Sequence, residues 1–313
     1  MLRIGVIGSI NCDTVTGPDG RAAHSLGGVL YTALAVGYLA GPQVEVRLLA
    51  RLGEDAQVEV LGLLARHPCV RLDGVRLVPR PTYRCHIRYA PDGGKTEVLS
   101  GGVGPLEWAD LAPHLADLDG LLVNFITGFE LERHVLQAAR ARVHGPLVMD
   151  FHSLALGRRP SGERYARRPP DWAAWLGLAD AVQMNREEAA VLCGAADLPE
   201  AQLATFAQRL LGLGPQAAAV TLGPSGALAC GRVGGSVRHV RVAADRPQAA
   251  VDPTGCGDVF LAAFGLALTR GVGLEGAVEQ ACRAAGANSR VRGIDGMQSL
   301  AALADVPAGS AAP

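Results

Sequence analysis

Continuous apolar segments and amphipathic segments alternate along most of the chain. The apolar runs, typical of strands buried on both faces of a sheet, occupy 3–9, 44–53, 121–125, 146–151, 179–185 and 217–223. Segments with helical spacing lie between or after them, among them 27–41, 55–65, 257–270 and 274–290. Strands alternating with helices predict a mostly parallel sheet covered on both faces.

Residues 70–99 depart from this alternation. Their apolar and polar positions alternate with a period of two, which predicts short antiparallel strands without a helix between them. We predict that 12–25 and 70–100 form a small β lobe on a large domain made of 1–11, 26–69 and 101–304. The C-terminal residues 305–313 are small and polar, and we expect them to be disordered.

Composition and charge exclude several classes of protein. The 313 residues carry a net charge of -1, which argues against a nucleic-acid-binding protein. No apolar run reaches the roughly 18 residues that a membrane span needs. The seven cysteines show no CxxC spacing, which indicates reduced thiols in a cytoplasmic protein.

The segment 251–260, VDPTGCGDVF, carries the strongest chemical signal. Gly255, Cys256 and Gly257 offer backbone N–H groups at the start of an apolar helix, where the aligned peptide dipoles favour an anion. Asp258 would ordinarily repel that anion, so its presence suggests a role as proton acceptor for a hydroxyl that attacks a phosphate. The alternative is an ordinary helix cap made by Asp or Thr.

This segment resembles the signature of the ribokinase-like family, the phosphofructokinase-B type carbohydrate kinases. Further pieces resemble the family in its own order, namely GSINCD at 8–13, GG at 27–28, NREE at 185–188 and TLGPSG at 221–226. Together they extend over about residues 3–293. The resemblance implies a three-layer α/β/α domain with a mostly parallel central sheet and a small β lid.

The resemblance also implies roles for the phosphoryl-transfer residues. Asp258 would be the catalytic base, with the N–H groups of Gly255, Cys256 and Gly257 as the anion hole. Asn185 and Glu188 would organise Mg²⁺ through water, and their alternative is a helix capping box. The nucleotide side would comprise Thr221, Gly223 and Gly226, whose alternative is an ordinary β-turn.

On the acceptor side, the resemblance implies contacts from Asn11, Asp13, Gly27, Gly28 and Thr32. Thr32 stands where many sugar kinases of the family carry asparagine, which leaves the acceptor open. The alternatives are a polar turn after the first strand and a helix start at the glycine pair. In some relatives the segment of Asp252 and Thr254 helps to bind a monovalent cation, so a requirement for K⁺ is also open.

Two further features carry no assigned role. His152 follows the predicted strand 146–151, and it fits either a ligand contact or a structural residue. The long segment after it holds five arginines, for which a solvated surface is the preferred interpretation and anion binding the alternative. They are Arg158, Arg159, Arg164, Arg167 and Arg168.

The resemblance implies an ATP- and Mg²⁺-dependent kinase that transfers the γ-phosphoryl group to a hydroxyl of a small sugar. A nucleoside kinase of the adenosine type is the alternative, and a sugar- or nucleotide-binding module without catalysis is a more distant one. A Rossmann oxidoreductase is disfavoured because the chain lacks a full G-x-G-x-x-G after its first strand. The expected partners are small molecules, with neither nucleic acid nor membrane, and a homodimer through the lid is plausible.

Overall fold

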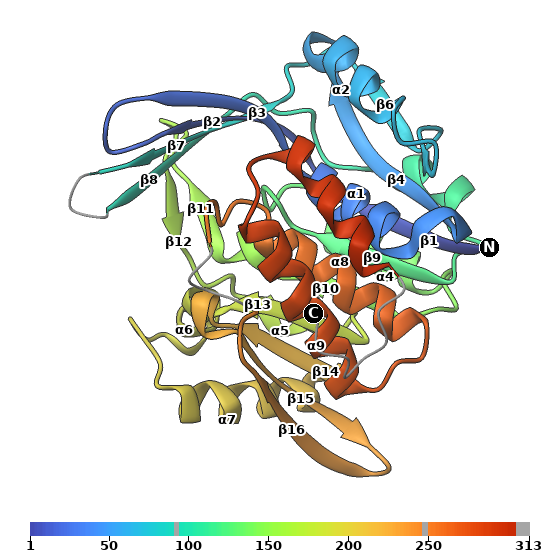
Figure 1. Cartoon of the computed structure of the whole chain (residues 1–313), viewed down its shortest axis with the longest axis vertical. Coiled ribbons are helices and arrows are strands. Elements are labelled where there is room, and N and C mark those ends of the chain that lie inside the picture. The colour runs from blue at the N-terminus through green and yellow to red at the C-terminus, as the bar shows by residue number, and fades with distance from the viewer. Residues whose placement is uncertain (91–93, 246–249, 305–313) are drawn as a thin grey trace.

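The structure, a computed structural model, describes residues 1–90, 94–245 and 250–304. Within these residues a large sheet with helices on both faces adjoins a separate small sheet (Figure 1). None of the described helices is long and apolar enough to cross a bilayer. The expected disorder of 305–313 concerns residues outside the described ranges.

The large sheet has ten strands in the described part of the chain. These are β1 (Leu2–Ile7), β4 (Val44–Gly53), β5 (Val70–Arg71), β6 (Val75–Val78), β9 (Gly120–Asn124), β10 (Leu147–Asp150), β13 (Ala181–Asn185), β14 (Ala217–Thr221), β15 (Ala227–Val233) and β16 (Ser236–Val242). Their order is β16-β15-β14-β13-β10-β9-β1-β4-β5, with β6 also paired to β4. All pairs from β14 to β5 and β6 are parallel, and β15 and β16 are antiparallel at one edge.

Helices pack against both faces of this sheet. One face is covered by α1 (Val29–Ala40), α2 (Gln57–Leu64), α8 (Cys256–Thr269) and α9 (Leu274–Ser289). The other is covered by α3 (Trp108–Leu111), α4 (Arg133–Arg140), α5 (Trp172–Leu176), α6 (Arg186–Cys193) and α7 (Glu200–Leu210). Short 3-10 helices occupy Gly41–Gln43, Glu54–Ala56, Ala112–His114, His152–Ala155, Leu211–Leu213, Gly223–Ser225 and Ile294–Leu303.

Because helices cover both faces of the sheet, its strands have continuous apolar sequences. In β1, Ile4 and Val6 belong to the core under α1 and α8, whereas Ile7 belongs to the core under the opposite helices. Successive side chains of a strand point to opposite faces, so each face needs its own apolar set. The predicted α/β architecture is therefore confirmed.

The small sheet projects from one end of the large domain (Figure 1). Its strands are β2 (Ile10–Thr16), β3 (Ala22–Gly28), β7 (Tyr83–Tyr89) and β8 (Lys95–Ser100), in the order β3-β2-β7-β8. A hairpin of β11 (Leu156–Arg158) and β12 (Arg164–Ala166) adjoins it, since the Leu99 N–H donates to the Gly162 carbonyl at 2.9 Å. The small sheet thus has contributions from two distant parts of the sequence and contacts a third.

The prediction for 70–99 is wrong in its first part. β5 and β6 pair in parallel with β4 of the large sheet, and only β7 and β8 form an antiparallel pair in the small sheet. Strands of two and four residues carry too short a pattern to specify a partner. The lid predicted at 12–25 and 70–100 stays a prediction, and the strands of the small sheet that lie in or beside these ranges are β2, β3, β7 and β8.

Candidate active site

Four neighbouring parallel strands end in polar residues at one edge of the large sheet. These last residues are Asn124 of β9, Asp150 of β10, Asn185 of β13 and Thr221 of β14. The N-terminus of α8 meets the same edge, where a cavity of about 720 Å³ lies between the large domain and the small sheet. Open α/β sheets bind ligands beyond the carboxyl ends of their strands, so this edge is the candidate site.

The turn before α8 requires glycine at one position. Gly255 has a φ of 76°, and a Cβ there would overlap the ring of Tyr31. The N–H of Cys256 donates to the Pro253 carbonyl at 3.2 Å. Within the described residues, the N–H groups of Gly255 and Gly257 have no acceptor. Two of the three predicted anion-hole donors are therefore unpaired at the positive end of the α8 dipole.

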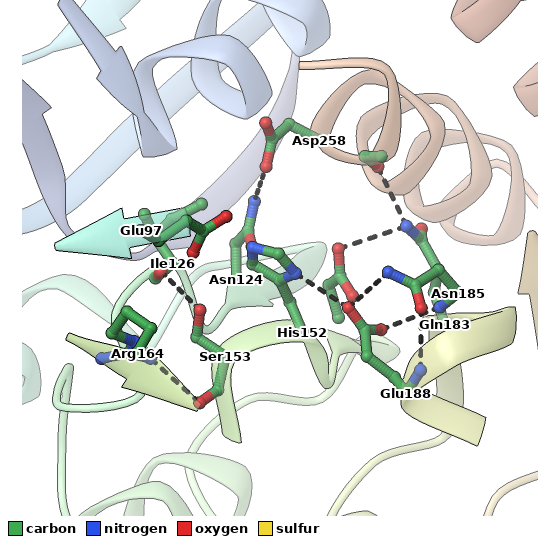
Figure 2. A network of polar contacts seen from close by, with 12 residues as sticks. Glu97, Asn124, Ile126, His152, Ser153, Arg164, Gln183, Asn185, Glu188 and Asp258 are labelled. Carbon is green, nitrogen blue, oxygen red and sulfur yellow. Dashed lines mark hydrogen bonds and ion pairs between the residues drawn. The ribbon is translucent and has the colours of Figure 1, made fainter. Parts of the chain in front are cut away.

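Asp258 lies in the first turn of α8 and is held by a residue that the sequence interpretation missed. Asn124 donates through Nδ2 to Asp258 Oδ1 at 2.7 Å (Figure 2). Burial raises the pKa of Asp258, and the hydrogen bond from Asn124 acts in the opposite direction by favouring the carboxylate. The available signal was a single polar residue at the end of the apolar run 121–125.

Thr32 lies behind this pair and not on the cavity. Its side chain is fully buried, its Oγ1 accepts from Asn124 Nδ2 at 2.8 Å, and it is absent from the cavity lining within the described residues. The structure thus separates Thr32 from Asn11, Asp13 and Gly28, the predicted acceptor contacts that line the cavity. It supports Asn124, which in turn orients Asp258.

Gln183 connects the sheet to the first turn of α8. Its Nε2 donates to the Gly257 carbonyl at 2.9 Å and to Asp150 Oδ2 at 3.2 Å (Figure 2). Burial and the negative charge of Glu188 raise the pKa of Asp150 well above its usual range. The contact fixes the turn whose N–H groups face the cavity.

Asn185 and Glu188 form the capping box that their spacing allowed. Asn185 Oδ1 accepts from the Glu188 N–H at 2.8 Å, and Glu188 Oε2 accepts from the Asn185 N–H at 2.8 Å. Both residues also line the cavity. The capping geometry is therefore present, and a role toward a metal ion stays a prediction.

His152 lies against the carboxylate of Glu188. Its Nδ1 lies 2.9 Å from Glu188 Oε1, and its backbone has a φ of 22°, unusual for a residue other than glycine. Burial lowers its pKa, but the hydrogen bond with Glu188 and the charges of Glu188 and Asp150 together raise it to about 10. His152 also lines the cavity, and its contact with Glu188 favours the charged imidazolium.

On the acceptor side, Asn11 and Asp13 face the cavity from β2. Asn11 Oδ1 and Asp13 Oδ1 are buried without a hydrogen-bond partner among the described residues. Burial, with the charges of Asp258 and Glu97, raises the pKa of Asp13 to about 7. Buried unpaired oxygens are rare in folded proteins, so these two indicate a ligand with hydroxyl donors.

Glycine is required for different reasons at the two positions that end β3. A Cβ on Gly27 would overlap the carboxylate of Asp13, and Gly27 itself does not line the cavity within the described residues. Gly28 lines the cavity with a φ of 65°. Gly27 therefore makes room for Asp13, and Gly28 allows the turn into α1.

The other end of the cavity is formed by the turn after β14. The Leu222 N–H donates to the Gly226 carbonyl at 2.7 Å around the 3-10 helix Gly223–Ser225. Thr221, Gly223 and Gly226 all line the cavity, opposite small residues of α9, namely Ala285, Gly286 and Ser289. The β-turn is present, and its contact with a nucleotide stays a prediction.

Asp252 and Thr254 form a local turn. Asp252 Oδ1 accepts from the Thr254 N–H at 2.9 Å, and the Thr254 carbonyl accepts from Asn288 Nδ2 at 2.9 Å. The Cys256 thiol donates to the Ala285 carbonyl at 3.4 Å, away from the anion turn. Thr254 takes part in these contacts through its backbone and Asp252 through its carboxylate, and a K⁺ site stays a prediction.

The arginine-rich segment is only in part a solvated surface. Arg159 is exposed, pairs with Glu163 at 3.4 Å and stacks on Tyr165. Arg164 instead lines the cavity, and its Nη1 is buried without a partner among the described residues. The preferred interpretation of the arginines is therefore wrong for Arg164.

Comparison with known proteins agrees with this geometry. Residues 159–298 match the profile of the pfkB family of carbohydrate kinases. The chain carries a pfkB carbohydrate kinase domain. The matched region contains the capping box, the turn after β14 and the whole anion turn with Asp258. The match confirms the predicted resemblance, and together with the kinase relatives it supports the predicted reaction type, a phosphotransferase that acts on a hydroxyl group.

Individual relatives differ in what they bind. A cytidine kinase of Thermococcus kodakarensis is 27% identical over 276 residues, which cover 88% of this chain and 91% of that protein. An Arabidopsis thaliana ribokinase, solved with ribose and ATP, superposes with a TM-score of 0.75 at 21% identity over 98% and 100% of the two chains. A pyrophosphate-dependent kinase solved with myo-inositol gives a TM-score of 0.76 at 18% identity over 96% and 100%. The two structures establish the fold.

Proposed function

We propose that the protein is an ATP-dependent kinase that phosphorylates a hydroxyl of a sugar or nucleoside. One observation carries the proposal: Asp258 lies beside the unpaired N–H groups of Gly255 and Gly257, facing a cavity with unpaired hydroxyl-accepting oxygens opposite. Ribokinase-family kinases use ATP with a divalent metal. A base beside an anion site is the arrangement that phosphoryl transfer to a hydroxyl requires.

In the proposed reaction, the acceptor hydroxyl gives its proton to Asp258. Its oxygen forms a bond to the γ-phosphorus, while the bond from that phosphorus to the bridging oxygen of ADP breaks. The N–H groups of Gly255 and Gly257 stabilise the charge on the transferring phosphoryl oxygens. Asn11 and Asp13 hold other hydroxyls of the acceptor, and the turn 221–226 contacts the nucleotide.

Metal binding in this proposal is indirect. No group of three or more His, Cys, Asp or Glu side chains in the described residues is arranged to hold a metal ion. Both oxygens of Glu188 already accept hydrogen bonds from Asn185, and Oε1 also contacts His152. This donor set suits an ion that keeps its water shell, so Asn185 and Glu188 would contact the waters of Mg²⁺ bound to the phosphates.

The remaining expectations stay predictions. They are a K⁺ requirement at Asp252 and Thr254, a homodimer through the small sheet, and a cytoplasmic location. Closure of the small sheet over the acceptor would exclude water from the transferring group.

The direct test is ADP release with ATP and Mg²⁺ against a panel of sugars and nucleosides, with pyrophosphate as the alternative donor. We expect ADP-linked phosphorylation of at least one acceptor. Turnover with pyrophosphate alone would overturn the donor assignment, and no turnover with any acceptor or donor would overturn the kinase proposal. A nucleoside acceptor is the second candidate, because the cytidine kinase match extends over most of both chains.

Asn124 provides a separate test of the base. We expect Asn124→Ala to lower kcat about tenfold, the usual cost of a lost hydrogen bond to a charged group. Loss of this bond should raise the pKa of Asp258, so the acidic limb of the kcat–pH profile should move to higher pH. Gln137→Ala, an exposed amide on α4, is the matched control. An unmoved profile would contradict the proposed role of Asn124.

A further inference from the structure

The wall of the cavity on the small sheet is apolar with two charged residues. Alternate side chains of β7 and β8 face the cavity, as the period of a strand requires. They are Cys85, Ile87, Tyr89, Lys95, Glu97 and Leu99. Ile126 adds a further apolar contact, and Arg164 of β12 lines the cavity nearby. An apolar slot with a few fixed polar groups is typical of a site that recognises a flat, partly polar ligand.

Arg164 is held in place by the backbone of its hairpin. The Leu99 N–H donates to the Gly162 carbonyl at 2.9 Å, and Val98 pairs with Glu163 across the same junction. The guanidinium lies 5.6 Å from the ring centre of Phe129, and its Nη2 makes only a 3.5 Å contact with the Ser153 carbonyl. The hairpin therefore fixes a donor at the cavity wall.

One donor of Arg164 has no partner in the described part of the chain. Its Nη1 is buried and unpaired among the described residues, although guanidinium groups are strong donors that normally find acceptors. Burial lowers the pKa of Arg164, and the negative charge of Glu97 acts in the opposite direction. Arg164 forms no ion pair with Glu97 or with any other described residue. The missing acceptor is one that a ligand would supply.

Glu97 offers the complementary group. Its side chain is 22% exposed, and its Oε1 pairs with Lys95, which leaves Oε2 for a ligand. Figure 2 draws Glu97 and Arg164 on the same side of the site, away from Glu188 and Gln183. An ionised carboxylate only accepts hydrogen bonds and a guanidinium only donates them, so the pair requires a ligand with a donor and an acceptor.

We propose that Glu97 and Arg164 select a nucleoside acceptor whose base carries an exocyclic amino group beside a ring acceptor, as cytidine and adenosine do. This inference rests on the proposed kinase function. Glu97 accepts from the amino group, and Arg164 donates to the neighbouring ring nitrogen or carbonyl. An anionic sugar would suit Arg164 alone, because Glu97 and Asp13 repel a second negative charge. The ribose hydroxyls then lie toward Asn11, Asp13 and Asp258.

The test uses two pairs of nucleosides that differ by the exchange of the amino group for a keto group. These pairs are cytidine with uridine, and adenosine with inosine. We expect kcat/KM with ATP to favour the amino member of at least one pair by tenfold or more, with most of the difference in KM. Titration calorimetry of the same nucleosides without donor gives the same ratio independently of catalysis.

Two substitutions test the residues themselves. Glu97→Gln adds a donor at the amino-reading position, so the amino-to-keto ratio should fall by tenfold or more. Arg164→Gln should raise KM for the preferred nucleoside by tenfold or more. Glu163→Gln and Arg159→Gln, the same changes at exposed positions of the hairpin, should leave ratio and KM within twofold. Thermal unfolding of each variant separates lost binding from lost folding.

The outcomes separate this inference from the proposed function. Phosphorylation of nucleosides without amino preference, or of sugars alone, would overturn the inference and leave the kinase standing. Amino-selective binding in the calorimeter without turnover would support the inference and count against the kinase. Equal effects of Glu97→Gln and Glu163→Gln on the ratio would also overturn it. Absence of nucleoside binding in both assays would do the same.

Discussion

Asp258→Asn is expected to lower kcat by about 10³-fold while leaving ATP affinity within about twofold. General bases contribute roughly 10²–10⁴-fold, and the amide cannot take the proton from the acceptor hydroxyl. Asparagine keeps the size of aspartate and still accepts from Asn124, so the first turn of α8 should persist. Steady-state kinetics and nucleotide titration measure the two effects separately.

Asp295→Asn is the matched control, because Asp295 is exposed and its one ion pair with a described residue is a 3.5 Å contact with Arg66. It should leave kcat unchanged. Normal turnover in Asp258→Asn would show that another group accepts the proton. Loss of ATP binding together with turnover would instead indicate that Asp258 shapes the donor site.

Gly255→Ala is expected to lower kcat at least 10²-fold and also to lower the melting temperature. The φ of 76° strains any residue with a Cβ, at a cost of roughly 1–2 kcal/mol. The new Cβ would also overlap the ring of Tyr31, so the anion turn must move. A misplacement of about 1 Å can cost a factor of about 10² in rate.

Gly271→Ala separates strain from displacement. Gly271 has a φ of 74°, and a Cβ there meets no atom within 4 Å. It should lower the melting temperature by a similar backbone cost, yet leave kcat within twofold. If Gly255→Ala kept normal turnover, the turn could not be the anion site. If Gly271→Ala lost turnover equally, global destabilisation would explain both.

The large domain could be predicted from the sequence because its strands are buried on both faces. Runs such as 121–125 and 217–223 have few other stable locations, and the glycine turn before α8 is specific in both spacing and chemistry. The strands of 70–78 could not be assigned, since two to four residues do not encode which neighbour they pair with.

The site was predictable only where a motif was local. Asp258, Asn185 and Glu188 come from short signatures, and the structure places them on one cavity. Asn124 can donate to Asp258 only because the sheet places the end of β9 beside α8. No local sequence pattern predicts that proximity. Thr32 failed as an acceptor contact for the same reason, since α1 turns its side chain toward Asn124.

The hairpin of β11 and β12 has a consequence for how this chain tolerates changes in length. The β15–β16 hairpin offers a contrast, because a Cβ on Gly234 or Gly235 at its tip would meet nothing within 4 Å. Insertions there disturb only a free turn. The tip of the β11–β12 hairpin is hydrogen-bonded to Leu99 of β8. The segment that leads into β11 starts directly after Asp150, which lies next to the anion turn. The length of the hairpin segment is therefore constrained at its tip and at its start. An insertion or deletion in this segment would alter acceptor contacts and phosphoryl transfer together.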